Sequence, residues 1–167
     1  VDVVVSLTSE EEFIEKSGVN QIELIKKMVF EIIHFPIIDR SIAGHYAMEN
    51  LTSTITKHLA KGMNVVVHCS AGIGRTGTVL ACTLLKSFED WSAEHSIKVL
   101  THLTPSIEPE NEKQVCFVHN YSHFLRNLPL LKKWSVADND SSILVFREAT
   151  VIYPNYRSIF KFQNYFV

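Results

Sequence analysis

The sequence has few of the residues that build disulfide-linked or metal-bound folds. Its 167 residues include three cysteines, Cys69, Cys82 and Cys116. An odd number of cysteines without a CxxC pair supports neither a disulfide framework nor a zinc site. The histidines show no metal-ligand spacing either, so we expect no metal and no cofactor. This cysteine usage is typical of a reducing, cytoplasmic protein.

The sequence also lacks a strong excess of either charge and any long apolar run. A formal net charge of −2 argues against nucleic acid or an anionic membrane as the main partner. No apolar run approaches the ~20 residues of a membrane span and no signal peptide is visible, so we expect no stable membrane insertion. The chain begins at Val1, inside a predicted strand. We therefore expect that a natural N-terminal part is missing.

What is present is a regular alternation of strand and helix patterns. With 46% hydrophobic residues, the chain has enough apolar material for one well-buried core. Apolar β-branched runs predict strands at 2–7, 30–38 and 64–69. Helical periodicity, capping residues and glycines predict helices from 8 or 9 to 18, and at 21–28, 44–61, 74–88, 93–103 and 111–128. This order predicts an α/β fold with a mostly parallel central sheet flanked by helices.

The character of the chain changes after Trp134. Residues 137–142 read as a turn, and the runs ILVF and TVIY read as strands. We therefore expect one domain over residues 1–133. Residues 134–167 are expected to form a C-terminal β-rich extension packed on the same domain.

The stretch VVVHCSAGIGRTGTVL, residues 65–80, combines a thiol, glycines and an arginine at a strand-to-helix turn. Gly72 and Gly74 allow successive backbone N–H groups to point into one concavity, and the helix that follows adds its positive end. Arg75 brings a planar pair of donors suited to two phosphate oxygens. The same field favours the thiolate of Cys69. A loop of this kind is suited to nucleophilic attack on phosphorus.

Two other glycine-rich turns fit less well. The ATP-binding loop needs G-x-x-x-x-G-K-[ST], and this stretch has no lysine. Gly72, Gly74 and Gly77 do match the spacing of a dinucleotide-binding G-x-G-x-x-G. However, no acidic residue ends a following strand about 20 residues later, because the chain there reads as helix.

The string HCSAGIGRTG resembles the signature loop of the protein-tyrosine phosphatases. The resemblance implies that Cys69 is the nucleophile and Arg75 the phosphate clamp. It also implies that His68 holds the loop and keeps the thiolate poised, and that the Thr76 hydroxyl bonds the sulfur and eases hydrolysis. The loop amides that bind phosphate would then belong to Ser70, Ala71, Gly72, Ile73, Gly74 and Arg75.

Asp39 is the candidate general acid. The strands at 30–38 and 64–69 are joined by one predicted helix, so they run parallel and their carboxyl ends meet at one edge of the sheet. Asp39 and Arg40 directly follow the first of these strands. The pattern HFPIID resembles the Pro-x-x-Asp acid loop of the dual-specificity branch. Arg40 is a candidate for a supporting cation beside the acid.

A glutamine that positions the hydrolytic water is harder to place. The resemblance implies one in a loop before the last helix, where this chain reads SIEPENEKQVCF. Glu108 and Glu110 stand where an amide is expected. Gln114 follows, and it reads either as the water-positioning residue or as a surface residue of the helix.

The resemblance covers about residues 3–128 and predicts a cysteine-dependent phosphatase of the dual-specificity type. Its partner would be a phosphoprotein or phosphopeptide carrying phosphotyrosine, with weaker activity on phosphoserine and phosphothreonine. The first alternative is a phosphoinositide or inositol-phosphate phosphatase on the same fold, although Ser70, Ala71 and Ile73 put no lysine in the loop. The second is a phosphoprotein-binding module without activity. Such modules usually lose the cysteine, the arginine or the acid, and this chain has all three.

Overall fold

The computed structural model of the protein describes residues 1–28 and 31–136. The chain divides into two compact units, 1–127 and 128–167. The strands predicted after residue 142, and with them the β-rich extension, lie outside the described residues. The domain boundary expected at residue 133 therefore stays a prediction.

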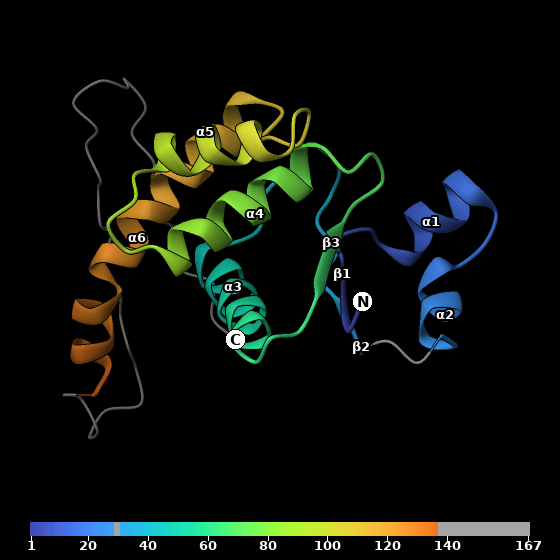
Figure 1. Ribbon diagram of the computed structural model, residues 1–167, viewed down its shortest axis with the longest axis horizontal. Helices are drawn as coiled ribbons and strands as arrows, with labels where there is room; N and C mark the ends of the chain where they lie inside the picture. The colour runs from blue at the N-terminus through green and yellow to red at the C-terminus, as the bar shows by residue number, and fades with distance from the viewer. Residues whose placement is uncertain (29–30, 137–167) are drawn as a thin grey trace. The chain divides into compact units, whose positions relative to one another are not determined.

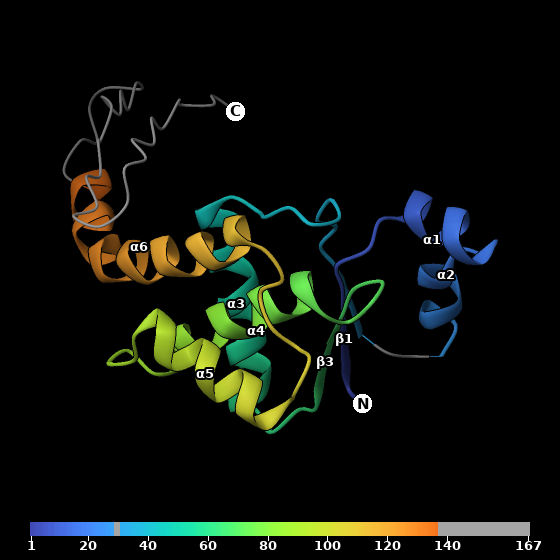
Figure 2. The ribbon, with the colours of Figure 1, turned by 90° about the horizontal axis from the view of Figure 1, so that it is seen from above.

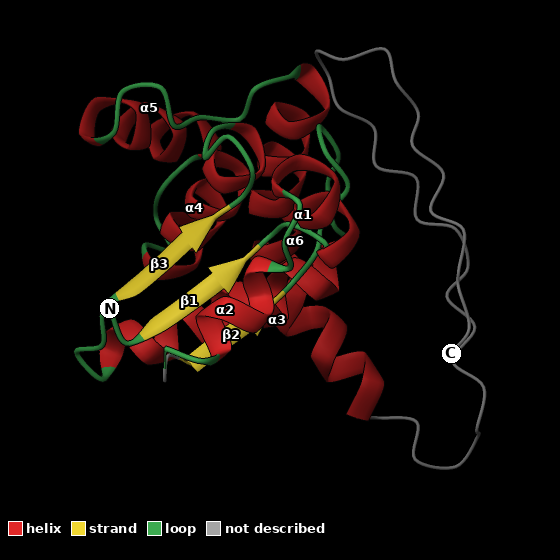
Figure 3. Ribbon diagram, turned by 90° about the vertical axis from the view of Figure 1, so that its right-hand side faces the viewer, coloured by secondary structure: helices red, strands yellow, loops and turns green. Residues whose placement is uncertain are grey.

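Within the described residues, the sheet has three short strands. They are β1 (Val3–Ser6), β2 (Glu31–His34) and β3 (Val65–His68), in the order β2-β1-β3, and Figure 3 shows that β1 and β3 run parallel. The register aligns Ser6 with both His34 and His68. The predicted α/β fold with a parallel sheet is confirmed. The central place of β1 means that the ends of all three strands meet at one edge.

The strands are shorter than the sequence predicts. Backbone hydrogen bonds between the neighbouring segments nevertheless continue past the strand ends. Leu7 N donates to His68 O at 2.9 Å, and Phe35 N donates to Ser6 O at 2.9 Å. Ile37 N then donates to Leu7 O at 3.0 Å. Pro36, which lies between these donors, has no N–H to give. These contacts carry the chain from the sheet directly toward residues 38–41.

Six helices are described, and most follow the predicted ranges. They are α1 (Glu10–Ser17), α2 (Gln21–Lys26), α3 (His45–Ala60), α4 (Gly74–Ser87), α5 (Ala93–Leu103) and α6 (Glu112–Val136). Ser9 caps α1, and Gly18 ends it with a left-handed φ of 75°. The predicted end of α6 at residue 128 is wrong, because the helix continues through Pro129. A proline removes one backbone donor and bends a helix without always ending it.

The helices of the first unit cover both faces of the sheet. Figure 1 shows α1 and α2 on one side of the strands and α3 and α4 on the other, and Figure 2 shows the same separation from above. Within the described residues, none of the helices combines the length and apolar character that crossing a bilayer requires.

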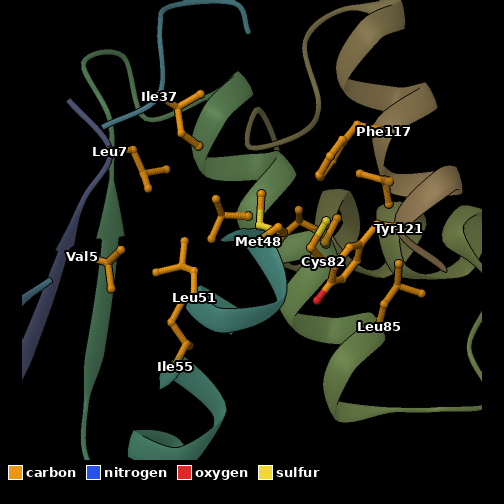
Figure 4. Close-up of a cluster of buried hydrophobic side chains, with 14 of the residues drawn as sticks. Val5, Leu7, Ile37, Met48, Leu51, Ile55, Cys82, Leu85, Phe117 and Tyr121 are labelled. Atoms are coloured by element: carbon orange, nitrogen blue, oxygen red, sulfur yellow. The ribbon is translucent and has the colours of Figure 1, made fainter. Parts of the chain in front are cut away.

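The core lies between the sheet and the layer of α3, α4 and α6. Figure 4 shows Val5 and Leu7 facing Leu51 and other apolar side chains of the helices. Inside the core, Thr52 and Tyr121 share a buried hydrogen bond of 2.8 Å between their hydroxyls. Burial raises the pKa of Tyr121, so the phenol stays neutral. The core thus fixes α4, whose first turn faces the edge where the strands end.

Candidate active site

The turn between β3 and α4 begins with Cys69, immediately after the strand. Gly72 has a left-handed φ of 74°, a conformation that glycine adopts without a steric cost. The helix then starts at Gly74, so its first N–H groups point back over the turn. This arrangement of backbone donors at a helix N-terminus is suited to an anion.

The Cys69 side chain is 7% exposed and lies within this turn. Burial opposes ionisation of the thiol, but other interactions outweigh it. The hydroxyl of Thr76 donates to Cys69 Sγ at 3.2 Å. Backbone N–H groups of Thr76 and Gly72 and the charge of Arg75 act in the same direction, so the pKa of Cys69 is lowered. The site therefore eases ionisation of this thiol relative to an ordinary cysteine.

Arg75 is almost fully buried, with 2% of its side chain exposed. Its two terminal nitrogens donate to the two carboxylate oxygens of Glu12 at 2.7 and 2.8 Å. One of them also donates to Ile37 O at 2.9 Å. The hydrogen bonds to Arg75 lower the pKa of Glu12 to about 2, and Glu12 in turn raises the pKa of Arg75. The guanidinium is thus held in one orientation beneath the turn.

Asp39 contacts the same arginine. Its Oδ1 is 3.0 Å from the second terminal nitrogen of Arg75, while 58% of its side chain is exposed. The next residue, Arg40, has a left-handed φ of 58°, which is uncommon outside glycine. Asn111 donates to Arg40 O at 3.1 Å and so fastens this segment to the start of α6. The predicted acid and the predicted arginine clamp therefore lie together in the structure.

A pocket of about 190 Å³ opens at this edge of the sheet. It combines the cysteine turn, the segment after β2, one residue of α1 and one from the loop before α6. Its lining consists of Lys16, Asp39, Arg40, Cys69, Ser70, Ala71, Gly74, Arg75 and Glu110.

His68 is the last residue of β3 and contacts the first residue of the turn. Its Nδ1 lies 3.4 Å from Cys69 O, and its ring centroid is 6.0 Å from that of Phe13. Among the described residues, its buried Nε2 finds no hydrogen-bond partner. The predicted influence of His68 on the thiolate stays a prediction.

Gln114 is not a surface residue, and that interpretation of the sequence is wrong. Its side chain is fully buried. The side-chain oxygen accepts a hydrogen bond from Glu110 N at 2.8 Å, and the side-chain nitrogen donates to Ser41 O at 3.4 Å. Gln114 is absent from the pocket lining and instead ties two loops of the pocket together. Its burial is tolerated because its side chain forms hydrogen bonds with backbone groups of both loops, Glu110 N and Ser41 O.

Sequence reasoning missed two charged residues that the fold brings to the site, Glu12 and Lys16. Glu12 pairs with Arg75, and Lys16 donates to Ser70 Oγ at 3.0 Å. Both lie on α1, which follows β1. The signal that could have found them is the position of β1, because a central parallel strand delivers the residues after it to the same edge as its neighbours.

The sequence also matches a family model over residues 1–89, more than half of the chain. That family is described as "Polymorphic toxin system, DSP-PTPase phosphatase". The matched region contains α1, the segment with Asp39 and the whole cysteine turn.

Solved structures with this fold include three phosphatases. Kinase associated phosphatase (KAP), with its catalytic-site cysteine replaced by serine, has 22% identity and a TM-score of 0.70, over 75% of this chain and 71% of that one. Tk-PTP in its active form has 23% identity and a TM-score of 0.63, over 73% and 78% of the two chains. PTPMT1 in complex with PI(5)P has 20% identity and a TM-score of 0.66, over 77% and 81%. At these identities the likeness shows the fold.

The family match and the shared fold lead to one assignment. The chain belongs to the DSP-PTPase phosphatases of polymorphic toxin systems, and it is an enzyme of the dual-specificity branch of the cysteine-dependent protein-tyrosine phosphatases.

Proposed function

We propose that this enzyme hydrolyses phosphotyrosine, and more weakly phosphoserine and phosphothreonine, through a phosphocysteine intermediate. Cys69 is the nucleophile, Arg75 and the amides of residues 70–75 bind the phosphoryl group, and Asp39 transfers protons. Thr76 and His68 support the thiolate. The partners are phosphoproteins or phosphopeptides.

In the first step, the Cys69 thiolate attacks phosphorus and the bond to the leaving oxygen breaks. Asp39 gives its proton to that oxygen, so an alcohol or phenol departs. The incoming phosphoryl oxygens compete with Asp39 for the terminal nitrogen of Arg75, which lies 3.0 Å away in the free enzyme. This competition frees the carboxyl group to face the leaving group.

In the second step, water attacks the phosphocysteine. The new O–P bond replaces the S–P bond, whose electron pair returns to Cys69 as thiolate. One water proton passes to the Asp39 carboxylate, and inorganic phosphate leaves. The hydroxyl of Thr76, 3.2 Å from the sulfur, stabilises the departing thiolate.

One observation carries this proposal above the others. The thiol with a lowered pKa and the buried guanidinium face the same small pocket, beneath a turn of backbone donors. Positive charge and oriented N–H groups at this place stabilise the equatorial oxygens of a transferring phosphoryl group. A side chain able to donate a proton lies within the same pocket lining.

The test compares hydrolysis of phosphotyrosine, phosphothreonine and inositol phosphate substrates by the wild-type enzyme and by Cys69→Ser. We expect the highest kcat/KM on phosphotyrosine peptides and no turnover by the variant. A preference of tenfold or more for an inositol phosphate, about 1.4 kcal/mol in the transition state, would contradict the proposed substrate.

An inositol-phosphate or phosphoinositide substrate is the second candidate. Lys16 and Arg40 both line the pocket, and Lys16 contacts Ser70 at the turn itself. These two cations suit a ring that carries more than one phosphate. PTPMT1, which shares the fold, was solved with PI(5)P. Replacing both Lys16 and Arg40 with alanine should weaken activity on such a ring more than on a phosphotyrosine peptide.

We also propose that the enzyme acts within a polymorphic toxin system, since the matched family is described in that way. A phosphatase that accepts several phosphoresidues would disturb many cytoplasmic proteins at once. Expression of the active chain in a bacterial host should therefore slow growth, and expression of Cys69→Ser to the same level should not. Equal growth of both strains would contradict this extension and leave the catalytic proposal standing.

A further inference from the structure

Three buried polar atoms near the carboxyl ends of β1 and β3 have no hydrogen-bond partner among the described residues. They are Ser6 Oγ, Thr8 Oγ1 and His68 Nε2. Ser6 is 0% exposed and Thr8 is 1% exposed. A buried polar group without a partner is costly, so two hydroxyls and a ring nitrogen at such a place call for a ligand.

The sheet brings Ser6 and His68 together on one face. The register pairs Ser6 with His68, and paired residues of neighbouring strands point to the same side. Val5 and Leu7 face the core helices in Figure 4, so Ser6, which alternates with them, points to the opposite side. Figure 1 shows α1 on that side. The ring centroid of His68 is 6.0 Å from that of Phe13 on α1, which places the His68 ring there as well.

Thr8 reaches the same face of the sheet. His34 is the other register partner of Ser6, so its side chain also points toward α1. Its Nε2 lies 3.0 Å from Thr8 O. The backbone of Thr8 therefore crosses this face beside Ser6. The three unpartnered atoms belong to one polar region between the sheet and α1, and this region adjoins the cysteine turn because Cys69 follows His68.

We propose that Ser6 Oγ, Thr8 Oγ1 and His68 Nε2 bind one internal water, and that Ser6 and Thr8 thereby position His68. A buried water typically makes about three hydrogen bonds to polar groups that lack other partners. The water donates to Nε2, and each hydroxyl can donate to the water or accept from it. With Nε2 as the acceptor, the proton of the neutral ring lies on Nδ1. This Nδ1 is 3.4 Å from Cys69 O and can donate to it.

The consequence is that the water selects one tautomer of His68 and one orientation of its ring. The ring in turn holds the Cys69 carbonyl, where the cysteine turn begins. Neither Ser6 nor Thr8 lines the pocket, so both act only through His68. The water site follows from the sheet alone, whereas the effect on the thiolate rests on the proposed function.

A high-resolution crystal structure of the free enzyme tests the water site directly. It should show one ordered water within hydrogen-bond distance of Ser6 Oγ, Thr8 Oγ1 and His68 Nε2. The double variant Ser6→Ala, Thr8→Val should lack this water, because two of its three partners are gone. Direct hydrogen bonds from the two hydroxyls to Nε2, or no ordered water at this place in the wild type, would overturn the water site.

Nitrogen NMR of the His68 ring tests the positioning. At a pH where the ring is neutral, the wild type should show a single tautomer with its proton on Nδ1. The double variant should show both tautomers. The rate at which iodoacetamide alkylates Cys69 at about pH 6 should also fall, by roughly threefold to tenfold, because a less ordered turn stabilises the thiolate less well. Mass spectrometry identifies the alkylated cysteine. Thr8→Ser keeps the hydroxyl and should resemble the wild type.

Ser96→Ala is the matched control. Ser96 is as buried as Ser6, but its hydroxyl already donates to Ala93 O at 2.8 Å within α5. The control should change neither the tautomer nor the alkylation rate. A single, unchanged tautomer in the double variant would overturn the positioning role, and so would equal effects of Thr8→Ser and Thr8→Val.

Two further points keep the outcomes separate. If the double variant fails to fold by circular dichroism, Thr8→Val alone is measured by the same criteria, because valine nearly preserves the volume of threonine. None of these measurements requires turnover. Their failure is therefore distinguishable from a failure of the proposed phosphatase reaction, which the assay of Cys69→Ser tests.

Discussion

The two sides of the pocket are built differently. On the phosphate side, Cys69 and Arg75 are buried, and the arginine is bound at both terminal nitrogens by Glu12. On the acid side, Asp39 is 58% exposed, and its neighbour Ile38 is 82% exposed. The segment that follows Asp39 is held by two side chains near the start of α6. Asn111 donates to Arg40 O and Gln114 donates to Ser41 O.

The difference follows from what each side must do. A phosphoryl group needs donors that are already in place, because their reorganisation would add to the barrier. A general acid must exchange its proton with water between turnovers, so it needs access to solvent. The structure therefore fixes the anion site by burial and fixes the acid through a few polar contacts. Substitutions on the two sides should therefore reduce activity by different amounts and should affect different steps or substrates.

The largest effect is expected at the centre of the phosphate side. Cys69→Ser should lower turnover by roughly 10⁴-fold or more, since a hydroxyl is far less nucleophilic than a thiolate at neutral pH. Binding of a phosphotyrosine peptide should persist, because the cradle and Arg75 remain. Calorimetry on the variant measures this binding, and appreciable residual turnover would falsify covalent catalysis through Cys69.

The acid side should show the next largest effect, with a dependence on the leaving group. Asp39→Asn should lower kcat by ~10²–10⁴-fold for a phosphotyrosine peptide. The loss should be smaller for an activated aryl phosphate, which needs little protonation. The acid limb of the pH–rate profile, set by the Cys69 thiolate, should remain. Equal losses of kcat on both substrates would indicate that Asp39 has a structural role and is not the general acid.

Arg75→Lys tests whether the phosphate side depends on geometry or on charge alone. A lysine keeps the charge but loses the planar pair of donors, so activity should fall by roughly 10²–10³-fold. The affinity for inorganic phosphate as an inhibitor should fall as well. Near-normal activity would show that a point charge is enough at this position.

Glu12→Gln tests the support of that arginine through stability as well as activity. Glu12 has a pKa of about 2 in the fold against 4.5 ordinarily, so its ion pair stabilises fully above pH 4.5. That stabilisation is lost as pH falls toward 2. Glu12→Gln should be less stable at pH 6, by up to about 3 kcal/mol, and should lose less stability between pH 4.5 and 2. Urea unfolding across this range measures both, and parallel pH profiles for the two proteins would contradict the ion pair.

The smallest effect should come from the attachment of the acid segment. Asn111→Ala removes the hydrogen bond to Arg40 O and the one that Asn111 Oδ1 accepts from Gln114 N, and it should lower kcat for a phosphotyrosine peptide by roughly threefold to tenfold. The thiolate limb of the pH profile should not move. Asn127→Ala, which removes an exposed hydrogen bond to His123 O on α6, is the matched control. A shifted acid limb in Asn111→Ala would show that the two sides of the pocket are coupled.

Much of the fold and part of the pocket are predictable from local patterns. The cysteine turn lies in a continuous motif, and Asp39 follows a strand that the sequence marks clearly. Glu12 is not predictable in this way, because three acidic residues in a row at the start of a helix read equally well as helix-end electrostatics. The pairing of Glu12 with Arg75 depends on the central place of β1 in the sheet, which local patterns do not give. The surface interpretation of Gln114 is wrong, because burial of a glutamine depends on two loops that are distant in sequence.

One further consequence follows from Gly77 in the first turn of α4. A Cβ at this position would lie 2.4 to 2.7 Å from backbone atoms of Glu108, so the loop packs directly on the helix. This contact excludes water from one side of the helix start. Because screening weakens as water is removed, the partial positive charge at the end of α4 should act on a bound anion through a lower local dielectric. A glycine outside the pocket lining thereby strengthens the field inside it.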